Sequence, residues 1–122
     1  MRTIIFYKHY FEEFFNTLTE KTKEKIDYVF FLIENTERVP AKFLKHLEGT
    51  DGLYEVRVKA GRDIFRIFCF FDKGKLVVLL NGFQKKTQKT PRQEIKTALR
   101  LKAEYFKNKQ KDGSKDIYTT SR

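Results

Sequence analysis

The chain has few of the residues on which many catalytic and structural sites depend. A single cysteine, Cys69, excludes an intramolecular disulfide, favours a reducing compartment and lies in an apolar stretch expected in the core. Two histidines, His9 and His46, lie far apart in the sequence, so no spacing typical of a zinc site is present. Gly-rich phosphate loops and the motifs of hydrolases and kinases are also missing. Any chemistry is therefore expected to need no metal or cofactor and to use Arg, Lys and Glu side chains.

Long apolar segments are absent as well. No apolar run approaches the roughly 18 residues of a membrane-spanning helix, and no signal peptide is visible. We therefore expect no membrane association and a cytoplasmic location. With 122 residues the chain fits one domain. We expect residues 1–110 to form it and residues 111–122 to be a flexible tail, because the tail has little apolar content.

Positive charge is what the chain has in excess. Lys and Arg number 26 against 16 Asp and Glu, which gives a net charge of +10 and a pI of about 9.7. A small basic domain is attracted to polyanions, and nucleic acid is the usual polyanion for such a domain. A hydrophobic fraction of 40% argues against wholesale disorder. The alternative explanation of the charge is a general richness in lysine, which outnumbers arginine here.

The N-terminal third of the chain predicts one strand followed by two helices. Residues 2–7 are β-branched and aromatic, which favours a strand. Residues 8–18 place aromatic side chains at helical spacing. A second helix follows, capped by Thr19 or Thr22 and ended before a proline. The segment 41–52 is predicted to be a connector with turns at its two glycines.

The remainder predicts three strands and a last helix. Residues 53–83 contain three strand patterns separated by two tight turns. The last helix is expected to use Thr90 as its N-cap and Pro91 as its first residue. Its apolar stripe is predicted to consist of Ile95, Leu99, Ala103 and Phe106. The expected order is β-α-α-β-β-β-α, an α+β fold with an antiparallel core sheet packed against helices.

The turn "AGRD" (60–63) sets the register of the first hairpin. Gly61 suits the first central position of a two-residue type II′ loop. That register places the apolar residues of both strands on one face of the sheet. It also places Arg57 directly opposite Arg66 on the other face.

Two arginines in directly opposite positions repel each other and destabilise a strand pair. Glu55 lies two residues from Arg57 on the same face and could neutralise them, which would give a surface Glu–Arg cluster without further function. The alternative is a phosphate cradle, because the planar fork of Arg binds two oxygens at once. Three arginines within residues 57–66 favour the cradle.

A cationic stretch, "NGFQKKTQKTP" (81–91), follows the third of these strands. That strand is apolar on both faces, so it is predicted to be central and to bring its end close to Arg66. A two-residue turn before the strand would put Lys85 on the arginine side, whereas a three-residue bulged turn would put Lys86 there. The sequence leaves both turns open.

A set of Arg, Lys and Glu side chains fits cleavage of an RNA phosphodiester bond, in which the 2′-hydroxyl is the nucleophile. The protein then needs to position the reacting groups and stabilise the extra negative charge. The candidate catalytic residues are Arg57, Arg66, Lys85, Lys86 and Glu55. Contacts to the surrounding RNA are assigned to Lys59, Arg62, Lys89 and Arg92, although a solvated basic surface would explain the same residues.

From about residue 3 to residue 108 the chain resembles the RelE/HigB toxin superfamily, in its phage-derived HigB-like branch. The most specific part of the resemblance is the pattern L-L-x-G-F-x-K-K-T-x-K-T-P, which ends at Pro91. The resemblance implies a RelE-like fold and a type II toxin that cleaves mRNA in the ribosomal A site. It implies cleavage without a metal, leaving a 2′,3′-cyclic phosphate. It also implies a cognate antitoxin as partner, often one with a helix-turn-helix.

The resemblance also assigns roles to single residues. Arg66 matches the arginine that contacts the scissile phosphate, and Arg57 matches a basic strand position. Lys85 and Lys86 match basic residues after the last strand. Glu55, however, falls where RelE-type members carry a lysine, and their C-terminal catalytic tyrosine has no clear counterpart. We therefore expect Glu55 or Lys85 to take the proton while the two arginines bind the phosphate.

Two other functions fit the same fold or the same charge. A ParE-like toxin would inhibit DNA gyrase by binding protein and would need neither Arg57 nor Arg66. A basic RNA- or ribosome-binding module would bind in a salt-dependent manner without cleavage. The cationic cluster after the third strand favours RNA as the target over the ParE-like action, and an endoribonuclease is the leading hypothesis.

Overall fold

Six strands and three helices are arranged around one sheet in the computed structural model, which describes residues 1–112 and 118–120. In chain order they are β1 (Thr3–Tyr7), α1 (Tyr10–Asn16), α2 (Glu20–Asn35), β2 (Leu44–His46), β3 (Tyr54–Ala60), β4 (Asp63–Asp72), β5 (Leu76–Lys85), α3 (Arg92–Asp112) and β6 (Tyr118–Thr120). The α+β class is confirmed. Among the described residues, no helix is both long enough and apolar enough to cross a membrane.

The strands lie in the order β2-β3-β4-β5-β1-β6. β1 pairs parallel with β5, so the sheet is mixed, and the prediction of an antiparallel sheet is wrong at this point. Every residue of β1 after Thr3 is buried, with alternate side chains on opposite faces, which suits a strand inside the sheet. The arrangement is compatible with a RelE-like fold, although β2 and β6 are additions to the predicted order.

Both additional strands are short and lie at the edges. β2 falls in the predicted connector 41–52 and pairs with only three residues of β3. β6 pairs antiparallel with β1 and falls in the expected flexible tail 111–122. The other residues of that tail lie in α3 or outside the described part of the chain. Three-residue strands are set by pairing with a neighbour rather than by a local pattern, so the sequence did not reveal them.

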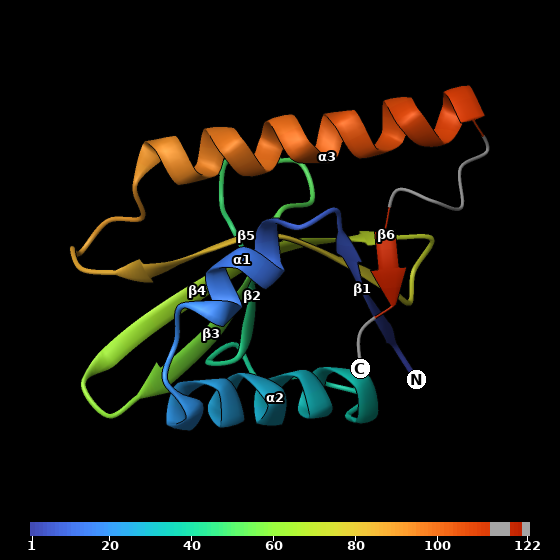
Figure 1. The fold of residues 1–122 in the computed structure, drawn as a ribbon. Coiled ribbons are helices and arrows are strands. Elements are labelled where there is room, and N and C mark those ends of the chain that lie inside the picture. Colours follow the sequence, from blue (N-terminus) through green and yellow to red (C-terminus); the bar gives the residue numbers. More distant parts are fainter. Residues whose placement is uncertain (113–117, 121–122) are drawn as a thin grey trace.

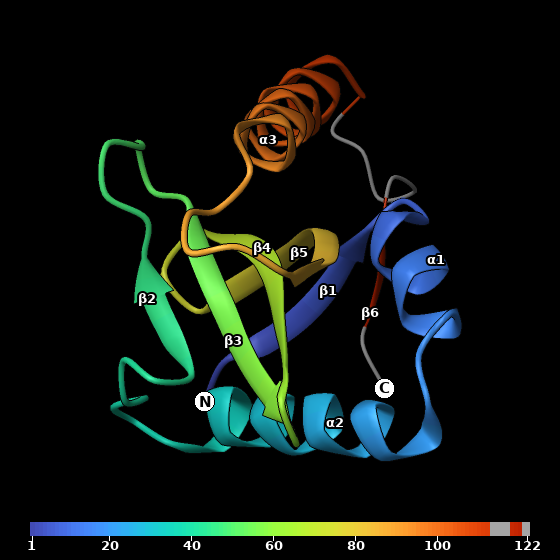
Figure 2. The same ribbon diagram turned by 90° about the vertical axis from the view of Figure 1, so that its left-hand side faces the viewer.

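Helices cover both faces of the sheet. Figures 1 and 2 show α2 on one side and α3 on the other. Phe11 of α1 and Ile26 and Phe30 of α2 belong to one apolar core, and Leu101 and Tyr105 of α3 belong to a second. The sheet therefore has no solvent-facing side wherever a helix lies over it, and only uncovered parts of it are available as a binding surface.

The buried stripe of α3 differs from the predicted one. Ala98, Leu101 and Tyr105 are buried, whereas Leu99 and Phe106 are exposed, and Ala103 is exposed as well. Both sets have helical spacing, so periodicity alone did not separate them. Tyr105 explains which of the two sets is buried. Its hydroxyl donates a hydrogen bond to Asp72 inside the protein, so its large ring can be buried.

The register of the β3–β4 hairpin is confirmed. Gly61 has a φ of 62°, and Ala60 pairs with Asp63 across a two-residue loop. The pairing continues along the strands and places Arg57 directly opposite Arg66.

The β4–β5 connection helps decide whether Lys85 or Lys86 lies on the side of the arginines. Asp72 pairs with Leu76, so the loop has three residues, which by itself would turn Lys86 towards Arg66. A β-bulge in β5 between the partners of Ile67 and Cys69 then shifts the register again. Beyond the bulge Ile64 pairs with Lys85, and Lys85 lies on the same face as the arginines.

Gly82 allows α1 to approach β5. A Cβ atom at this position would lie 2.5 Å from Cδ2 of Phe14 and 3.0 Å from its Cγ. The ring of Phe14 also packs against Phe65. The missing side chain therefore lets α1 lie close to the strand that carries Lys85.

We predict that Gly82→Ala lowers the free energy of unfolding by about 1–3 kcal/mol, because the ring of Phe14 must move to accommodate the new methyl group. Urea denaturation at neutral pH measures the loss. Phe14→Leu combined with Gly82→Ala should lose less than the sum of the two single variants, since the clash involves that ring. Strictly additive losses would show that the strain lies elsewhere.

A buried ionic group holds the C-terminal half of α3 on the sheet. Asp72, at the end of β4, accepts hydrogen bonds from the Tyr105 hydroxyl at 2.7 Å and from the Lys109 ammonium at 2.6 Å. Burial raises the pKa of the Asp72 carboxyl, but the hydrogen bonds from Lys109 and Tyr105 outweigh it and the net pKa is lowered. The ionised carboxylate thus stabilises the fold.

We predict that Asp72→Asn lowers the free energy of unfolding by about 1–3 kcal/mol at pH 7. The folded-state pKa lies below that of an unfolded aspartate, about 3.9, so the stabilisation is full above that pH and is lost as the pH falls through the folded-state pKa. The difference between variant and wild type should therefore shrink in acid. Denaturation series at several pH values test this, with exposed Asp51→Asn as control. A pH-independent difference would contradict it.

Candidate functional site

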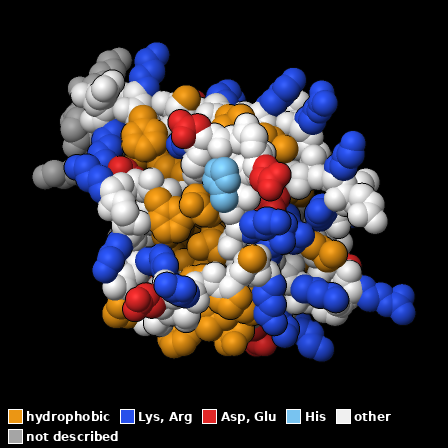
Figure 3. Space-filling model, turned by 180° about the vertical axis from the view of Figure 1, so that it is seen from behind, with side chains coloured by type: hydrophobic (Ala, Val, Ile, Leu, Met, Phe, Trp, Pro, Cys, Tyr) orange, Lys and Arg blue, Asp and Glu red, His pale blue; other side chains and the backbone are white. Residues whose placement is uncertain are grey.

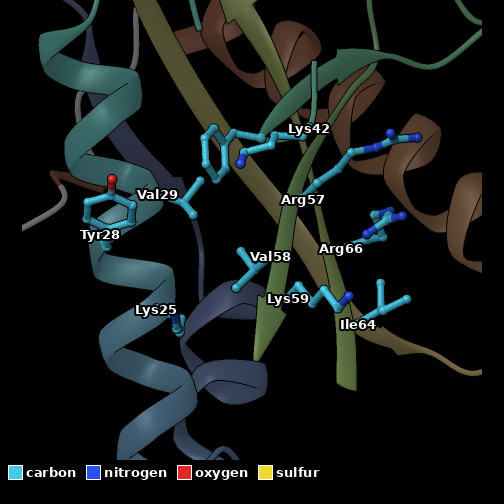
Figure 4. A pocket seen from close by; sticks show the side chains of 10 residues that line it. Lys25, Tyr28, Val29, Lys42, Arg57, Val58, Lys59, Ile64 and Arg66 are labelled. Atoms are coloured by element: carbon cyan, nitrogen blue, oxygen red, sulfur yellow. The ribbon is translucent and has the colours of Figure 1, made fainter. Parts of the chain in front are cut away.

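Part of the sheet face that carries α3 is not covered by it. Here two cross-strand rows run side by side, Arg57–Arg66–Phe83 and Lys59–Ile64–Lys85. Figure 4 shows Arg57 and Arg66 projecting to the same side of β3 and β4, away from α2. We use the name arginine face for the five residues Arg57, Lys59, Ile64, Arg66 and Lys85. Four of the five are cations.

A buried carboxylate neutralises the opposed arginines. Glu55 is 3% exposed, and its Oε1 accepts hydrogen bonds from Nε and Nη2 of Arg57 at 3.3 and 3.2 Å. Nε of Arg66 lies 3.8 Å from the same oxygen. The Glu–Arg cluster expected from the sequence therefore exists. The phosphate cradle is compatible with it, because the side chain of Arg57 keeps 28% of its surface exposed and that of Arg66 11%.

Arg66 is a partly desolvated cation. Its Nη1 donates a hydrogen bond to the Phe65 carbonyl at 3.2 Å, and its Nε is buried without a hydrogen-bond partner in the described residues. Burial and, to a lesser extent, the charge of Arg57 lower the pKa of Arg66, while Glu55 raises it. An arginine has so high an ordinary pKa that it stays charged at neutral pH. Its reduced hydration strengthens its attraction to an anion.

Thr90 links the part of the cationic stretch that follows β5 to this cluster. Its hydroxyl donates a hydrogen bond to Oε2 of Glu55 at 3.1 Å, and α3 begins only at Arg92. The prediction that Thr90 is the N-cap of the last helix is therefore wrong. Its side chain serves a long-range contact across the site instead of a local one.

The predicted site residues are only partly brought together. Lys85 and Lys59 belong to the arginine face, and Lys86 lies beyond the end of β5, where it lines a hollow of about 370 Å³ with Lys85 and Ile64. Arg62 is exposed in the hairpin turn. Lys89 and Arg92 are exposed before α3 and at its first residue. Figure 3 shows Lys and Arg side chains crowded on one part of the surface, beside an apolar area.

A cleft that the sequence did not reveal adjoins the arginine face. It has a volume of about 530 Å³ and is lined by Arg57, Arg66, Lys59, Ile64 and Val58 and also by Lys25, Tyr28, Val29, Lys42 and Phe43. The last five come from α2 and from the segment before β2. One signal was present: Tyr28 falls outside the buried stripe Ile26, Val29, Phe30 and Ile33 of α2 and is therefore free for another role.

Neither a metal site nor a reactive cysteine lies at the arginine face in the described part of the chain. Within residues 1–112 and 118–120 no group of three or more His, Cys, Asp or Glu side chains could hold a metal ion. Cys69 is fully buried, and burial strongly raises the pKa of its thiol, so it is a core residue as predicted and not a nucleophile.

We predict that Glu55→Gln lowers the free energy of unfolding by about 1–3 kcal/mol, because Arg57 and Arg66 then face each other without a neutralising charge. Sulfate should recover part of this loss, since a divalent anion can take the place of the carboxylate between two guanidinium groups. Thermal unfolding in sulfate and in chloride at equal ionic strength measures the effect. Glu104→Gln, which removes a carboxylate paired with Lys8, is the control. An equal sulfate response in wild type and Glu55→Gln would contradict the prediction.

Comparison with known proteins places the chain in a family. No curated protein matches it. The family model described as "Phage derived protein Gp49-like (DUF891)" matches residues 13–103. That range contains the whole arginine face, Glu55 and Thr90, and it covers most of the chain. The chain therefore belongs to the Gp49-like family of phage-derived proteins.

Proposed function

We propose that this chain is the toxin of a type II toxin–antitoxin pair and cleaves mRNA on the ribosome. The observation that carries the proposal is the directly opposed pair Arg57 and Arg66 on an uncovered part of the sheet. Lys59 and Lys85 flank this pair on the same face. Membership of a phage-derived family and the resemblance to HigB-like toxins support it further.

The two arginines suit the charge that develops during cleavage. Attack of the 2′-oxygen on phosphorus forms the cyclic phosphate and breaks the bond to the 5′-oxygen of the next nucleotide. The transition state carries more negative charge on the non-bridging oxygens than the diester does. Two guanidinium groups held side by side can donate hydrogen bonds to both oxygens, and fixed donors of this kind stabilise such a transition state.

Glu55 is proposed as a positioning residue and not as the general base. Its two oxygens are engaged by Arg57 and Thr90, and the side chain is almost fully buried. A carboxylate so occupied and so deeply buried holds the arginines in place and is poorly accessible to a substrate hydroxyl. Of the two residues expected from the sequence to take the proton, Glu55 and Lys85, only Lys85 remains. We propose that Lys85 takes the proton of the 2′-hydroxyl and delivers it to the departing 5′-oxygen.

The proposed partners follow from the same features. A net charge of +10 attracts the protein to the RNA-rich ribosomal A site. The cognate antitoxin, expected to carry a helix-turn-helix, would neutralise the toxin before it reaches that site. The proposed location is the cytoplasm, where ribosomes are.

We predict that Arg66→Ala lowers mRNA cleavage by about 10²–10³-fold, the usual effect of removing one donor to a transition-state oxyanion. Arg66→Lys should restore only part of it, because an ammonium lacks the planar fork. Cell-free translation of a defined mRNA, with mapping of fragment 5′ ends, measures the cuts. Cleavage should require translating ribosomes.

The matched control is Arg38→Ala, which removes an exposed arginine between α2 and β2 that belongs neither to the arginine face nor to the lining of the adjoining cleft. It should cleave as wild type does. Intact mRNA with gyrase-dependent DNA damage would replace the proposal with a ParE-like action. Blocked translation without cuts would replace it with ribosome binding alone.

A further inference from the structure

The edge of the sheet is open next to the arginine face. β2 pairs only with Tyr54–Val56 of β3, and the last backbone hydrogen bond between these segments runs from the Arg57 N–H to the Phe43 carbonyl at 2.7 Å. From Val58 to Ala60, β3 has no neighbouring strand on that side among the described residues. The cleft of about 530 Å³ lies at this open edge, between β3 and α2.

The lining of this cleft combines aromatic rings with cations. Two of its walls carry rings, Tyr28 on α2 and Phe43 before β2. Lys25 and Lys42 stand beside these rings, and both are exposed. None of the lining residues is acidic, so the cleft offers stacking surface and positive charge but no carboxylate. Figure 4 shows Tyr28 and Lys25 on the α2 side and the arginines on the other side of β3.

The ring of Tyr28 is exposed to solvent and is held in its orientation by Phe43. The residue is 55% exposed, and its ring meets that of Phe43 edge to face, with centroids 6.5 Å apart and an interplanar angle of 82°. Nζ of Lys42 lies 5.0 Å from the centroid of Phe43. Phe43 thus supports Tyr28 from one side, and the solvent-facing surface of the tyrosine remains available to a flat ligand.

We propose that this cleft binds one nucleotide of single-stranded RNA, with the base stacked on Tyr28 and backbone phosphates near Lys25 and Lys42. Stacking on aromatic side chains within a positively charged groove is how proteins hold unpaired strands. Arg57 and Arg66 line both the cleft and the arginine face, so an RNA strand bound there continues into the cleft. The subsite rests on the proposed function, since it receives a nucleotide neighbouring the cleaved bond.

The test compares wild type with Tyr28→Ala and, for each protein, compares an RNA with a chain that has no bases. Fluorescence anisotropy measures binding of a short single-stranded RNA whose 2′-oxygens are methylated, so that it cannot be cleaved through them. The same length of ribose-phosphate chain without bases is the second ligand. Tyr28→Ala should weaken binding of the RNA by about 5- to 150-fold and leave binding of the base-free chain nearly unchanged.

Two variants serve as controls for the ring. Tyr28→Phe keeps the stacking surface and should bind the RNA as wild type does. Phe31→Ala removes another aromatic residue of α2 that is 60% exposed but does not line the cleft, and it should have no effect. Lys42→Ala should reduce the slope of log affinity against log salt by about one phosphate contact.

The outcomes separate the subsite from the cleavage reaction. Unchanged RNA affinity in Tyr28→Ala, or an equal loss for RNA and base-free chain, would overturn the nucleotide subsite and leave the cleft to a protein partner. Cleavage that depends on Arg66 would still stand in that case. A base-dependent loss in Tyr28→Ala would support the subsite even if Arg66→Ala cleaved mRNA normally, which would refute only the catalytic proposal.

Discussion

The carboxylate of Glu55 is the interaction on which the site depends. Two arginines opposite each other on neighbouring strands repel, and the fold tolerates them because one buried anion lies between them. The same carboxylate accepts the hydroxyl of Thr90 and thereby ties the cationic segment before α3 to the sheet. One residue thus compensates a charge conflict and sets the distance between two basic elements. The pairing of β3 with β4 and the position of the segment before α3 both depend on this carboxylate.

The extent of α3 over the sheet determines what is left accessible. Its buried stripe covers the part of the face that carries Phe68 and Phe70, and the ion pair and hydrogen bond at Asp72 fix its far end. The arginine face lies beyond that cover. The arginine face carries four cations against the single buried carboxylate of Glu55, so like charges on it still repel each other in the isolated protein. Such a surface is typical of sites that are satisfied by a polyanionic partner.

Several features were accessible from the sequence because they depend on local rules. The type II′ turn at Gly61 fixed the pairing of Arg57 with Arg66, since alternation in a strand has a period of two. The apolar strand over residues 76–83 indicated a central position in the sheet, and β5 has neighbours on both sides. Thr19, one of the two caps that the sequence allowed for α2, accepts the N–H of Thr22, and Thr22 lies inside the helix.

Only the tertiary structure decided which distant segments contact each other. The sequence determined the class of fold, the hairpin register and the identity of the opposed arginines, because each follows from periodicity or turn chemistry within a few residues. It could not choose between Lys85 and Lys86. The three-residue loop and the distant bulge each reverse the side of the sheet that a lysine faces, and their effects cancel. The sequence also could not place Thr90 on Glu55, or Tyr28 in the same cleft as the arginines. Those neighbours are set by how whole elements pack, and no local pattern encodes that.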